Sequence, residues 1–349
     1  MEQTDVEVQE RQVKVSVLVA VYNGERFLRK CLDSLLRQTL RDIEVICIDD
    51  ASTDGSLGIL REYAEKDERV VVMHLDENKG QAHARNRGLE KARGEYVCML
   101  DCDDWMSDDA LASAVEVFEA NGDTDSVLFD LILVDEATSR EERFKLTGPS
   151  VLSGKEAFRK SLEWDGIHGV YMTRTELHRR YPYDETSMLY SDDNTSRIHF
   201  FYSREVRFCS GKYFYLQHSS SMTHAVGVRR FLVMRALKSL KNDIIQIAGD
   251  KEVIDSLENT IWLKTIDSYF FYYTHRGELS GDDLRFGLEE IKTAWREVET
   301  DRLDRHTTRK FGYVPLRPWV LFRLQEEMYF TLKNVKTFGR KSKVSIFVA

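Results

Sequence analysis

The sequence lacks the features of a secreted, membrane-spanning or nucleic-acid-binding protein. Its five cysteines are an odd number without a CxxC pair, so buried thiols in a reducing compartment fit better than disulfides or a zinc site. No apolar run approaches the roughly 18 residues that span a bilayer. The start of the chain is acidic and has no apolar core, and we expect no signal peptide. The net charge of −9 argues against generic nucleic-acid binding.

Two glycine-rich phosphate-binding motifs are also missing. The turn at residues 22–27, after the first predicted strand, has one glycine, whereas a dinucleotide-binding Rossmann domain needs a GxGxxG turn there. The sequence has no Walker loop either. These absences predict that a bound diphosphate is held through a metal ion rather than by a helix N-terminus alone.

The first 135 residues alternate between strand-like and helix-like periodicity. Continuous apolar strands separated by amphipathic helices predict an α/β fold with a mainly parallel sheet flanked by helices. Ligands of such sheets bind at the carboxyl ends of the strands. With 42% hydrophobic and 31% charged residues, the chain is typical of a soluble globular protein. We expect strands at residues 13–21, 43–48, 70–75 and 96–100, and helices at residues 26–38, 56–66 and 81–92.

Three carboxylates, Asp101, Asp103 and Asp104, follow the last of these strands without a basic residue among them. Carboxylates this close raise one another's pKa unless a cation lies between them. Oxygen ligands of this kind suit Mg²⁺ or Mn²⁺, which bridge proteins to substrate phosphates. The cluster therefore predicts a metal-diphosphate site. The alternative is a solvated acidic turn before the helix that begins near Ala110.

Five segments in one order resemble the family 2 glycosyltransferases, which have the GT-A fold. The resemblance covers residues 13–225. It implies a Rossmann-like sheet and inverting transfer of a sugar from a nucleoside diphosphate sugar, usually a UDP-sugar, with Mg²⁺ or Mn²⁺ as cofactor. The segments are residues 15–23 (VSVLVAVYN), 31–39 (CLDSLLRQT), 49–56 (DDASTDGS), 78–88 (NKGQAHARNRG) and 100–105 (LDCDDW).

Matched position by position, the resemblance implies a donor site along the strand ends. Asp50 would accept a hydrogen bond from the base, and Arg85 would lie along the nucleotide. Asp103 would ligate the metal directly, while Asp101 would contact the ribose or metal-bound water. Structural alternatives stay open, such as an Asx-turn acid for Asp50 and a surface cation for Arg85. The implied nucleotide-sugar-binding residues are Val21, Tyr22, Glu25, Asp50, Arg85 and Asp101, and the implied metal ligands are Asp101 and Asp103.

An inverting transfer needs a carboxylate that takes the proton of the acceptor hydroxyl. The family has this catalytic base in an acidic pair on a loop entering a helix, and here Asp192 and Asp193 occupy that place. The spacing to a predicted strand at residues 206–209 favours Asp192, whereas the family's Glu-Asp order favours Asp193. The alternative is an N-cap acid for a helix that begins near Asn194 and is predicted over residues 197–204.

From residue 226 the pattern changes to long helices, which predict a helical appendage. Its last part mixes aromatic and basic residues on an otherwise acidic chain, which is typical of contact with an anionic membrane; a solvated face with a buried seam is the alternative. We expect helices at residues 229–247, 251–273, 282–299 and 318–335. The predicted organisation is an N-terminal tail (1–12), a catalytic domain (13–225, with a nucleotide-sugar-binding half at 13–105 and an acceptor half at 106–225) and a C-terminal helical region with a basic aromatic tail (226–349).

With the resemblance, these residues predict a metal-dependent inverting glycosyltransferase of the hexosyltransferase type. The chain has neither a QxxRW motif nor membrane spans, so we expect transfer of a single sugar to a glycan or lipid-linked saccharide in cell-surface polysaccharide biosynthesis. Trp164, His168 and Tyr171 are candidates to line the acceptor pocket. We expect a cytoplasmic protein, peripheral at the inner face of the plasma membrane if its tail binds lipid. A non-catalytic nucleotide-sugar-binding module and a nucleotide-sugar hydrolase are the alternatives, and a homodimer stays open.

Overall fold

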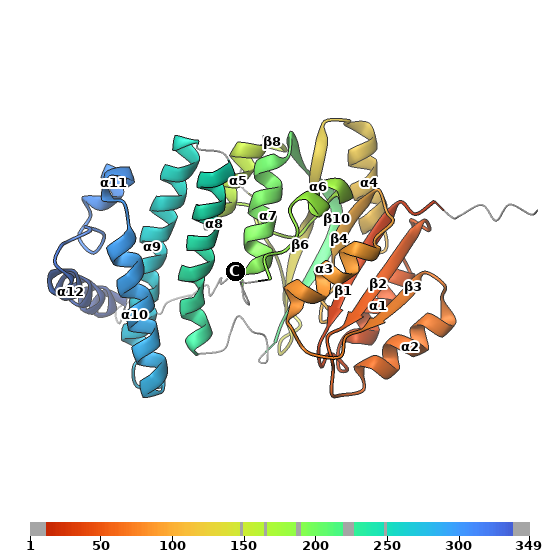
Figure 1. Cartoon of the computed structure of the whole chain (residues 1–349), viewed down its shortest axis with the longest axis horizontal. Helices are drawn as coiled ribbons and strands as arrows, with labels where there is room; N and C mark the ends of the chain where they lie inside the picture. The colour runs from red at the N-terminus through yellow and green to blue at the C-terminus, as the bar shows by residue number, and fades with distance from the viewer. Residues whose placement is uncertain are drawn as a thin grey trace, which may run out of the picture. The chain divides into compact units, whose positions relative to one another are not determined.

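The computed structural model describes residues 12–146, 149–163, 166–185, 190–218, 227–247 and 250–337 (Figure 1). As far as these residues are described, the chain divides into two compact units. The chain passes from one unit to the other more than once. The first unit consists of residues 1–157, 167–188 and 195–217, and the second consists of residues 158–166, 189–194 and 218–349.

The first unit is built on one mixed sheet with the strand order β3-β2-β1-β4-β9-β6-β10-β5. Strand β1 pairs in parallel with β2 and β4, and β2 pairs in parallel with β3. Strand β9 runs antiparallel between β4 and β6, and β10 is parallel to β6. The strands are β1 (Val15–Val21), β2 (Ile43–Asp49), β3 (Val70–His74), β4 (Tyr96–Met99), β5 (Trp105–Met106), β6 (Thr124–Asp135), β7 (Glu141–Arg143), β8 (Val151–Ser153), β9 (Tyr171–Arg174) and β10 (Glu205–Gln217).

The predicted mainly parallel sheet is confirmed, because β1 to β4, β6 and β10 all run in one direction. The antiparallel β9 was not predicted, since four residues are too few for a clear period-2 pattern. Strand β10 runs far beyond the predicted residues 206–209. It continues past a shift in register between Phe208 and Lys212, where Gly211 lies so close to Ala110 that a Cβ atom would stand 2.6 Å from the Ala110 Cα.

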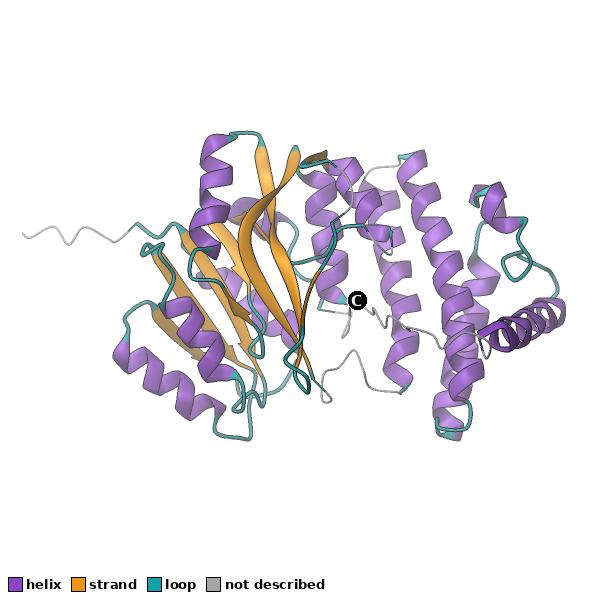
Figure 2. Cartoon of the chain, turned by 180° about the vertical axis from the view of Figure 1, so that it is seen from behind, coloured by secondary structure: helices purple, strands orange, loops and turns teal. Residues whose placement is uncertain are grey.

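Helices lie on both faces of this sheet (Figures 1 and 2). Apolar side chains at helical spacing bury one side of each helix, as Leu28, Leu32 and Leu35 do in α1. Helix α3 packs closely on β1 and β2 because Gly88 has no side chain, and a Cβ atom there would lie 2.6 Å from Ile48 Cδ1. The helices are α1 (Leu28–Leu36), α2 (Ser56–Lys66), α3 (Gln81–Lys91), α4 (Ala110–Ala120), α5 (Gly154–Leu162), α6 (Thr175–Arg180) and α7 (Ser191–Tyr202), of which α5 and α7 are divided between the two units.

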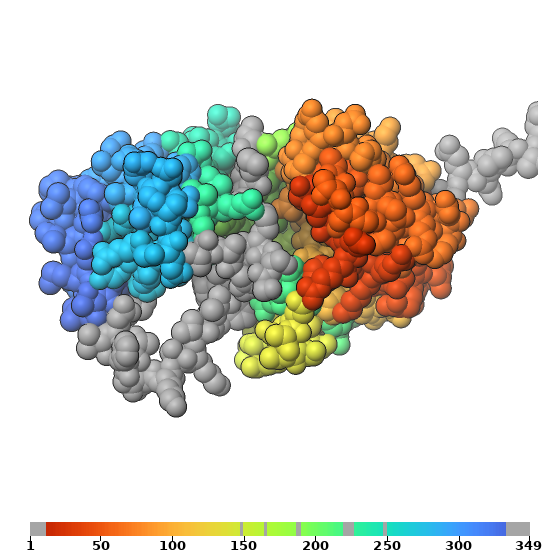
Figure 3. All heavy atoms as spheres, turned by 90° about the horizontal axis from the view of Figure 1, so that it is seen from below, coloured from red at the N-terminus to blue at the C-terminus, as the bar shows by residue number. Residues whose placement is uncertain are grey.

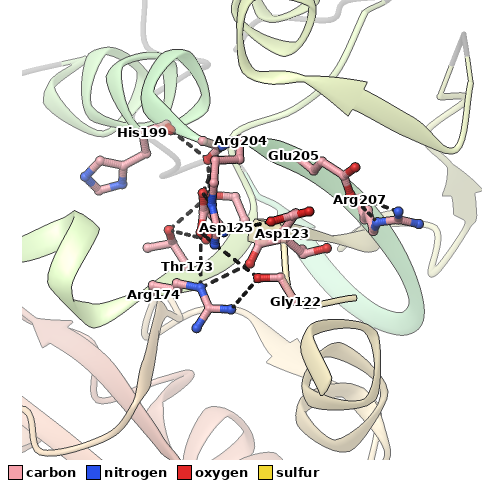
Figure 4. Close-up of polar contacts among 12 residues, drawn as sticks. Gly122, Asp123, Asp125, Thr173, Arg174, His199, Arg204, Glu205 and Arg207 are labelled. Carbon is pink, nitrogen blue, oxygen red and sulfur yellow. Dashed lines mark hydrogen bonds and ion pairs between the residues drawn. The ribbon is translucent and has the colours of Figure 1, made fainter. Parts of the chain in front are cut away.

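A buried carboxylate at the start of β6 binds a residue of β9 and the residue that precedes β10 (Figure 4). Asp125 accepts hydrogen bonds from Arg174 Nε at 3.1 Å and from Arg204 Nε at 2.9 Å. The Arg204 backbone N–H donates to the same carboxylate at 2.8 Å. Although burial opposes the effect, the Arg204 hydrogen bonds and the charge of Arg174 hold the pKa of Asp125 below its usual value. This network stabilises the edge of the sheet opposite the carboxyl ends of the parallel strands.

The second unit is a helical bundle around an aromatic core. Trp262, Tyr269, Phe322 and Phe330 are fully buried at its centre, and the atoms of the described residues from 227 onward are coloured from green-cyan to blue in Figure 3. Helix α9 begins at an N-cap, Asp250, whose side chain accepts from the Glu252 N–H at 3.0 Å. Among the described residues no helix is both long and apolar enough to cross a membrane. The elements are η1 (Val228–Leu232), α8 (Val233–Ile247), α9 (Lys251–His275), α10 (Gly281–Glu297), η2 (Thr300–Arg302), α11 (Arg305–Thr308) and α12 (Trp319–Thr337).

Candidate active site

The loops after β1 and β2 are bound to each other at the carboxyl edge of the sheet. Asn23, with φ of +53°, accepts a hydrogen bond at Oδ1 from the Thr53 N–H at 2.8 Å. Its own N–H donates to Ser52 Oγ at 3.0 Å. The Glu25 carboxylate accepts from the Gly55 N–H at 2.8 Å. These bonds fix the position of the residues at the end of β1.

The end of β1 presents an aromatic ring beside a buried backbone. Val21 is buried, and its carbonyl accepts from the Asp50 N–H at 2.8 Å. Tyr22, the next residue, is 51% exposed. A ring held at a strand end with half of its surface in solvent can stack on a planar ligand.

Asp50 connects the loop after β2 to the start of α3. It is buried, and its two carboxylate oxygens accept from the Lys79 N–H at 3.0 Å and the Gly80 N–H at 2.8 Å. Gly80 has a φ of +88°, which favours glycine at this turn. Each carboxylate oxygen can accept a second hydrogen bond. Asp50 is therefore both an anchor of the turn and a potential acceptor for a ligand.

The acidic residues after β4 form a compact group. Asp101, Asp103 and Asp104 each offer one carboxylate oxygen, and these oxygens all lie within 4.8 Å of one another. Mg²⁺ and Mn²⁺ take oxygen ligands in a small octahedral shell. The type of ligand and its spacing fit such an ion.

Asp104 holds the acidic group against β10. It is almost fully buried, and it accepts from Tyr213 Oη at 2.7 Å and from the Leu216 N–H at 2.8 Å. The Tyr213 hydroxyl in turn accepts from the Asp101 N–H at 3.2 Å. Burial, with the charges of Asp101 and Asp103, raises the pKa of Asp104 well above its usual value. Asp104 and Tyr213 therefore fix the loop that carries the other two acids.

Tyr213 was missed as a site residue by the sequence reasoning. The sequence around residue 213 is rich in aromatic residues, which is typical of a strand. Nothing in that pattern links the Tyr213 hydroxyl to Asp104, which lies more than a hundred residues earlier in the chain.

Arg85 contacts the acidic group directly. Its side chain is 2% exposed, and Nη2 donates to Asp101 Oδ1 at 2.5 Å. The guanidinium also lies 5.5 Å from the centre of the Tyr183 ring. This ion pair offsets part of the repulsion among the acids. The role of Arg85 along the nucleotide stays a prediction.

The acidic pair predicted to contain the base lies in the first turn of α7. This helix begins at Ser191, so the predicted start near Asn194 is wrong. Negative charges in a first turn interact favourably with the helix dipole. Asp192 and Asp193 belong to the second compact unit, whereas the predicted donor and metal residues are brought together in the first.

The structure describes two of the three residues predicted to line the acceptor pocket. Tyr171 is 4% exposed, packs with Phe200 in a hydrophobic cluster and has its hydroxyl 2.5 Å from His199 Nδ1, and its role in an acceptor pocket stays a prediction. Burial lowers the pKa of His168 to about 4, and its Nδ1 accepts from the Val170 N–H at 3.2 Å. Trp164 lies outside the described residues.

Comparison with known proteins identifies the family. The model of glycosyl transferase family 2 matches residues 16–220. The chain belongs to this family. Among curated relatives, the family 2 chain is 37% identical to the putative glycosyltransferase EpsH of Bacillus subtilis over 166 residues, which is 48% of this chain and 47% of EpsH. It is 39% identical to the poly(ribitol-phosphate) beta-glucosyltransferase of Bacillus spizizenii over 142 residues, 40% of this chain and 22% of the relative. The match thus spans about half of EpsH and less of the second relative.

Two solved structures share the fold of this family 2 chain. S. aureus TarS 1-349 in complex with UDP-GlcNAc has a TM-score of 0.70 at 18% identity, over 94% of this chain and 92% of TarS 1-349. The mannosyltransferase PcManGT from Pyrobaculum calidifontis, in complex with GDP-Man and Mn²⁺, has a TM-score of 0.53 at 18% identity, over 92% of this chain and 87% of PcManGT. The predicted GT-A-type α/β fold with a C-terminal helical region is confirmed.

Proposed function

We propose that this family 2 glycosyltransferase moves a single sugar from a nucleoside diphosphate sugar to a glycan or lipid-linked saccharide, with inversion and with Mg²⁺ or Mn²⁺. A UDP-sugar is the preferred donor, and the reaction belongs to cell-surface polysaccharide biosynthesis. The observation that carries the proposal is that Asp50 and the acids 101, 103 and 104 follow β2 and β4, two strands that run parallel to β1 and so end at the same edge of the sheet. Parallel sheets bind their ligands at this edge.

The nucleoside would lie against the ends of β1 and β2. Tyr22 would stack on the base, while the backbone beside it, at Val21, would line the base's edge. Asp50 would accept a hydrogen bond from a base N–H with a lone pair not used by the Lys79–Gly80 turn. Glu25 would keep the β1 loop in place through Gly55. Arg85 would hold Asp101 in position.

A divalent cation would be held by Asp103 and Asp101. When bound, it would offset the negative charge of the departing diphosphate. Asp104 is buried and holds the loop to β10 through Tyr213 and the Leu216 N–H, whereas Asp103 is only partly buried. We therefore assign Asp104 to positioning the loop and Asp103 to direct ligation.

The acceptor hydroxyl needs a base on the face of the sugar opposite the diphosphate. We assign this role to Asp192, with Asp193 as the alternative. The acceptor oxygen forms a bond to the anomeric carbon, the bond from that carbon to the diphosphate oxygen breaks, and the hydroxyl proton passes to a carboxylate oxygen. One displacement inverts the anomeric configuration.

The similar proteins support the donor class and the setting. TarS binds UDP-GlcNAc and PcManGT binds GDP-Man, so a nucleoside diphosphate sugar is common to both. The relative from Bacillus spizizenii acts on poly(ribitol-phosphate), a polymer acceptor.

The first test is calorimetric titration of the full chain with UDP, GDP and CDP, each with Mn²⁺ and with EDTA. We expect one nucleotide to bind, and to bind only with metal. Asp103→Asn should weaken this binding by at least about tenfold, since loss of even an indirect metal partner typically costs that much. Asp109→Asn, an equal change of charge at an exposed acid before α4, is the matched control. Equal nucleotide affinity for wild type and Asp103→Asn in Mn²⁺ would refute the metal assignment.

The second test separates the base from the binding residues. Asp192→Asn should leave nucleotide affinity unchanged and lower sugar transfer by about a hundredfold or more, the usual contribution of a general base. Asp193→Asn is the matched comparison, and the stronger loss identifies the base. If free sugar is released from the donor at the same rate with and without acceptor, the protein is a nucleotide-sugar hydrolase rather than a transferase. Nucleotide binding without turnover of any donor would favour a non-catalytic module.

A further inference from the structure

Helix α12 presents an apolar face to solvent. Val320, Leu321, Leu324, Met328 and Leu332, named here the apolar stripe, are each between 47% and 63% exposed. Their spacing places them on one side of the helix, over a length of about 18 Å at 1.5 Å per residue. Half of the ten large hydrophobic side chains that are exposed among the described residues belong to this stripe.

The opposite side of α12 is fully used in the core of the second unit. Phe322 and Phe330 are buried there, beside Tyr269 and Trp262 of α9. Helix α12 is therefore held in place by one face, and the stripe is not needed for packing within the described part of this unit. Soluble monomers rarely expose a continuous apolar face of this kind unless it binds something.

The charge of the chain points to the partner. Residues 333–343 contain five basic side chains and no acidic one, while the whole chain has a net charge of −9. The basic residues start at the C-terminal end of the stripe. A surface that combines an apolar interior with negative charge would satisfy both features, and an anionic lipid layer is such a surface.

We propose that α12 lies along an anionic lipid surface, with the apolar stripe at the boundary between head groups and acyl chains. An anionic surface also suits the excess of basic residues in the sequence from 333 to 343. The inference stands on the second unit and does not depend on the proposed sugar transfer.

A second copy of the chain fits the stripe less well. The two acids of α12 are not free to pair with basic residues of another copy, because Glu326 is buried and Glu327 accepts hydrogen bonds from Tyr269 at 2.6 Å and Arg323 at 3.0 Å. The stripe of another molecule would offer apolar contact without a negative partner.

The test is sedimentation of the full chain with vesicles of phosphatidylcholine alone and of phosphatidylcholine mixed with phosphatidylglycerol. We expect binding to the mixed vesicles, weakened by added salt. The double variant Leu324→Ser with Met328→Ser should require at least about tenfold more lipid for half-maximal binding, because it removes apolar contact area. The control double variant Ile245→Ser with Leu263→Ser changes two side chains of similar exposure on α8 and α9 and should bind as wild type does.

Three results would overturn the proposal. The first is absence of binding to the mixed vesicles, or equal binding by both double variants. The second is self-association in the absence of lipid that only the stripe variant abolishes, which would make the stripe an interface between copies. The third is a thermal midpoint for the stripe variant far below that of the control, which would mean that the chain itself covers the stripe.

Discussion

Glu326 makes the stability of the second unit depend on pH. The residue is fully buried on α12, and its Oε1 accepts from Gln325 Nε2 at 3.0 Å. Its Oε2 has no hydrogen-bond partner among the described residues. Burial raises the pKa of Glu326 to about 8, although the Gln325 hydrogen bond acts in the opposite direction.

The sign of the effect follows from the raised pKa. Below about pH 4.5, the ordinary value for this group, both the folded and unfolded chains hold the proton and Glu326 has no effect on stability. As the pH rises from there to about 8, the unfolded chain releases the proton and the folded chain keeps it, so stability falls. At about 1.4 kcal/mol per unit, the loss reaches at most roughly 5 kcal/mol above pH 8.

Glu326→Gln should remove this loss, because the amide is similar in shape and stays neutral. We expect urea unfolding to give similar stabilities for wild type and variant near about pH 5, and a variant more stable by up to roughly 5 kcal/mol near about pH 9. Glu289→Gln, at an exposed position on α10, is the control and should not change the pH dependence. A difference between Glu326→Gln and wild type that is constant, or that shrinks as the pH rises, would refute the reasoning.

Two further predictions concern the first unit. Tyr213→Phe keeps the ring but leaves the buried Asp104 carboxylate without one of its donors, so it should lower the free energy of unfolding by about 1–3 kcal/mol. It should also weaken Mn²⁺-dependent nucleotide binding in the calorimetric titration proposed above. Unchanged metal dependence of binding would show that Tyr213 does not support the site. Asp125→Asn should lower stability in urea unfolding at neutral pH by about 2–4 kcal/mol, because it leaves two guanidinium groups without their shared carboxylate. The difference should decrease as the pH falls below 3.8, the ordinary value for this group, because the unfolded wild-type chain then takes up a proton before the folded chain, whose Asp125 pKa is lowered. Asp123→Asn, at an exposed acid two residues earlier, should lower the free energy of unfolding by less than about 1 kcal/mol. An equal loss for both variants would show that the burial of Asp125 does not strengthen its contribution to stability.

Local patterns were enough to predict much of the first unit. Helix α2 has the predicted bounds, Ser56–Lys66, because its apolar residues follow a clear helical period and its ends are polar. The strand ends and their acids were also predicted from sequence, since continuous apolar runs end abruptly in polar turns at Asp49 and Asp101. These are properties of neighbouring residues, and sequence order contains them directly.

Contacts between distant residues could not be predicted in this way. The 13-residue β10 includes Ser210 and Gly211, which interrupt an apolar pattern but are tolerated where the strand passes Ala110. Strand β9 is recognisable only by its pairing with β4 and β6. Both features depend on which segments meet in space, and that information is not present in a local window.

The acidic loop after β4 illustrates how these two kinds of information combine. The sequence contains three carboxylates and no basic residue between positions 99 and 105, and this mutual repulsion led to the prediction of a bound cation. The structure supplies part of the missing positive charge from α3, through Arg85 on Asp101, and ties Asp104 to the hydroxyl of Tyr213. Asp101 and Asp103 are both partly buried, whereas Asp104 is buried. The three acids are thus chemically equivalent in the sequence and distinct in the fold. Substitution of Asp104 would also loosen the loop from Tyr213, and substitution of Asp101 would also break its ion pair with Arg85, so we test metal binding first at Asp103.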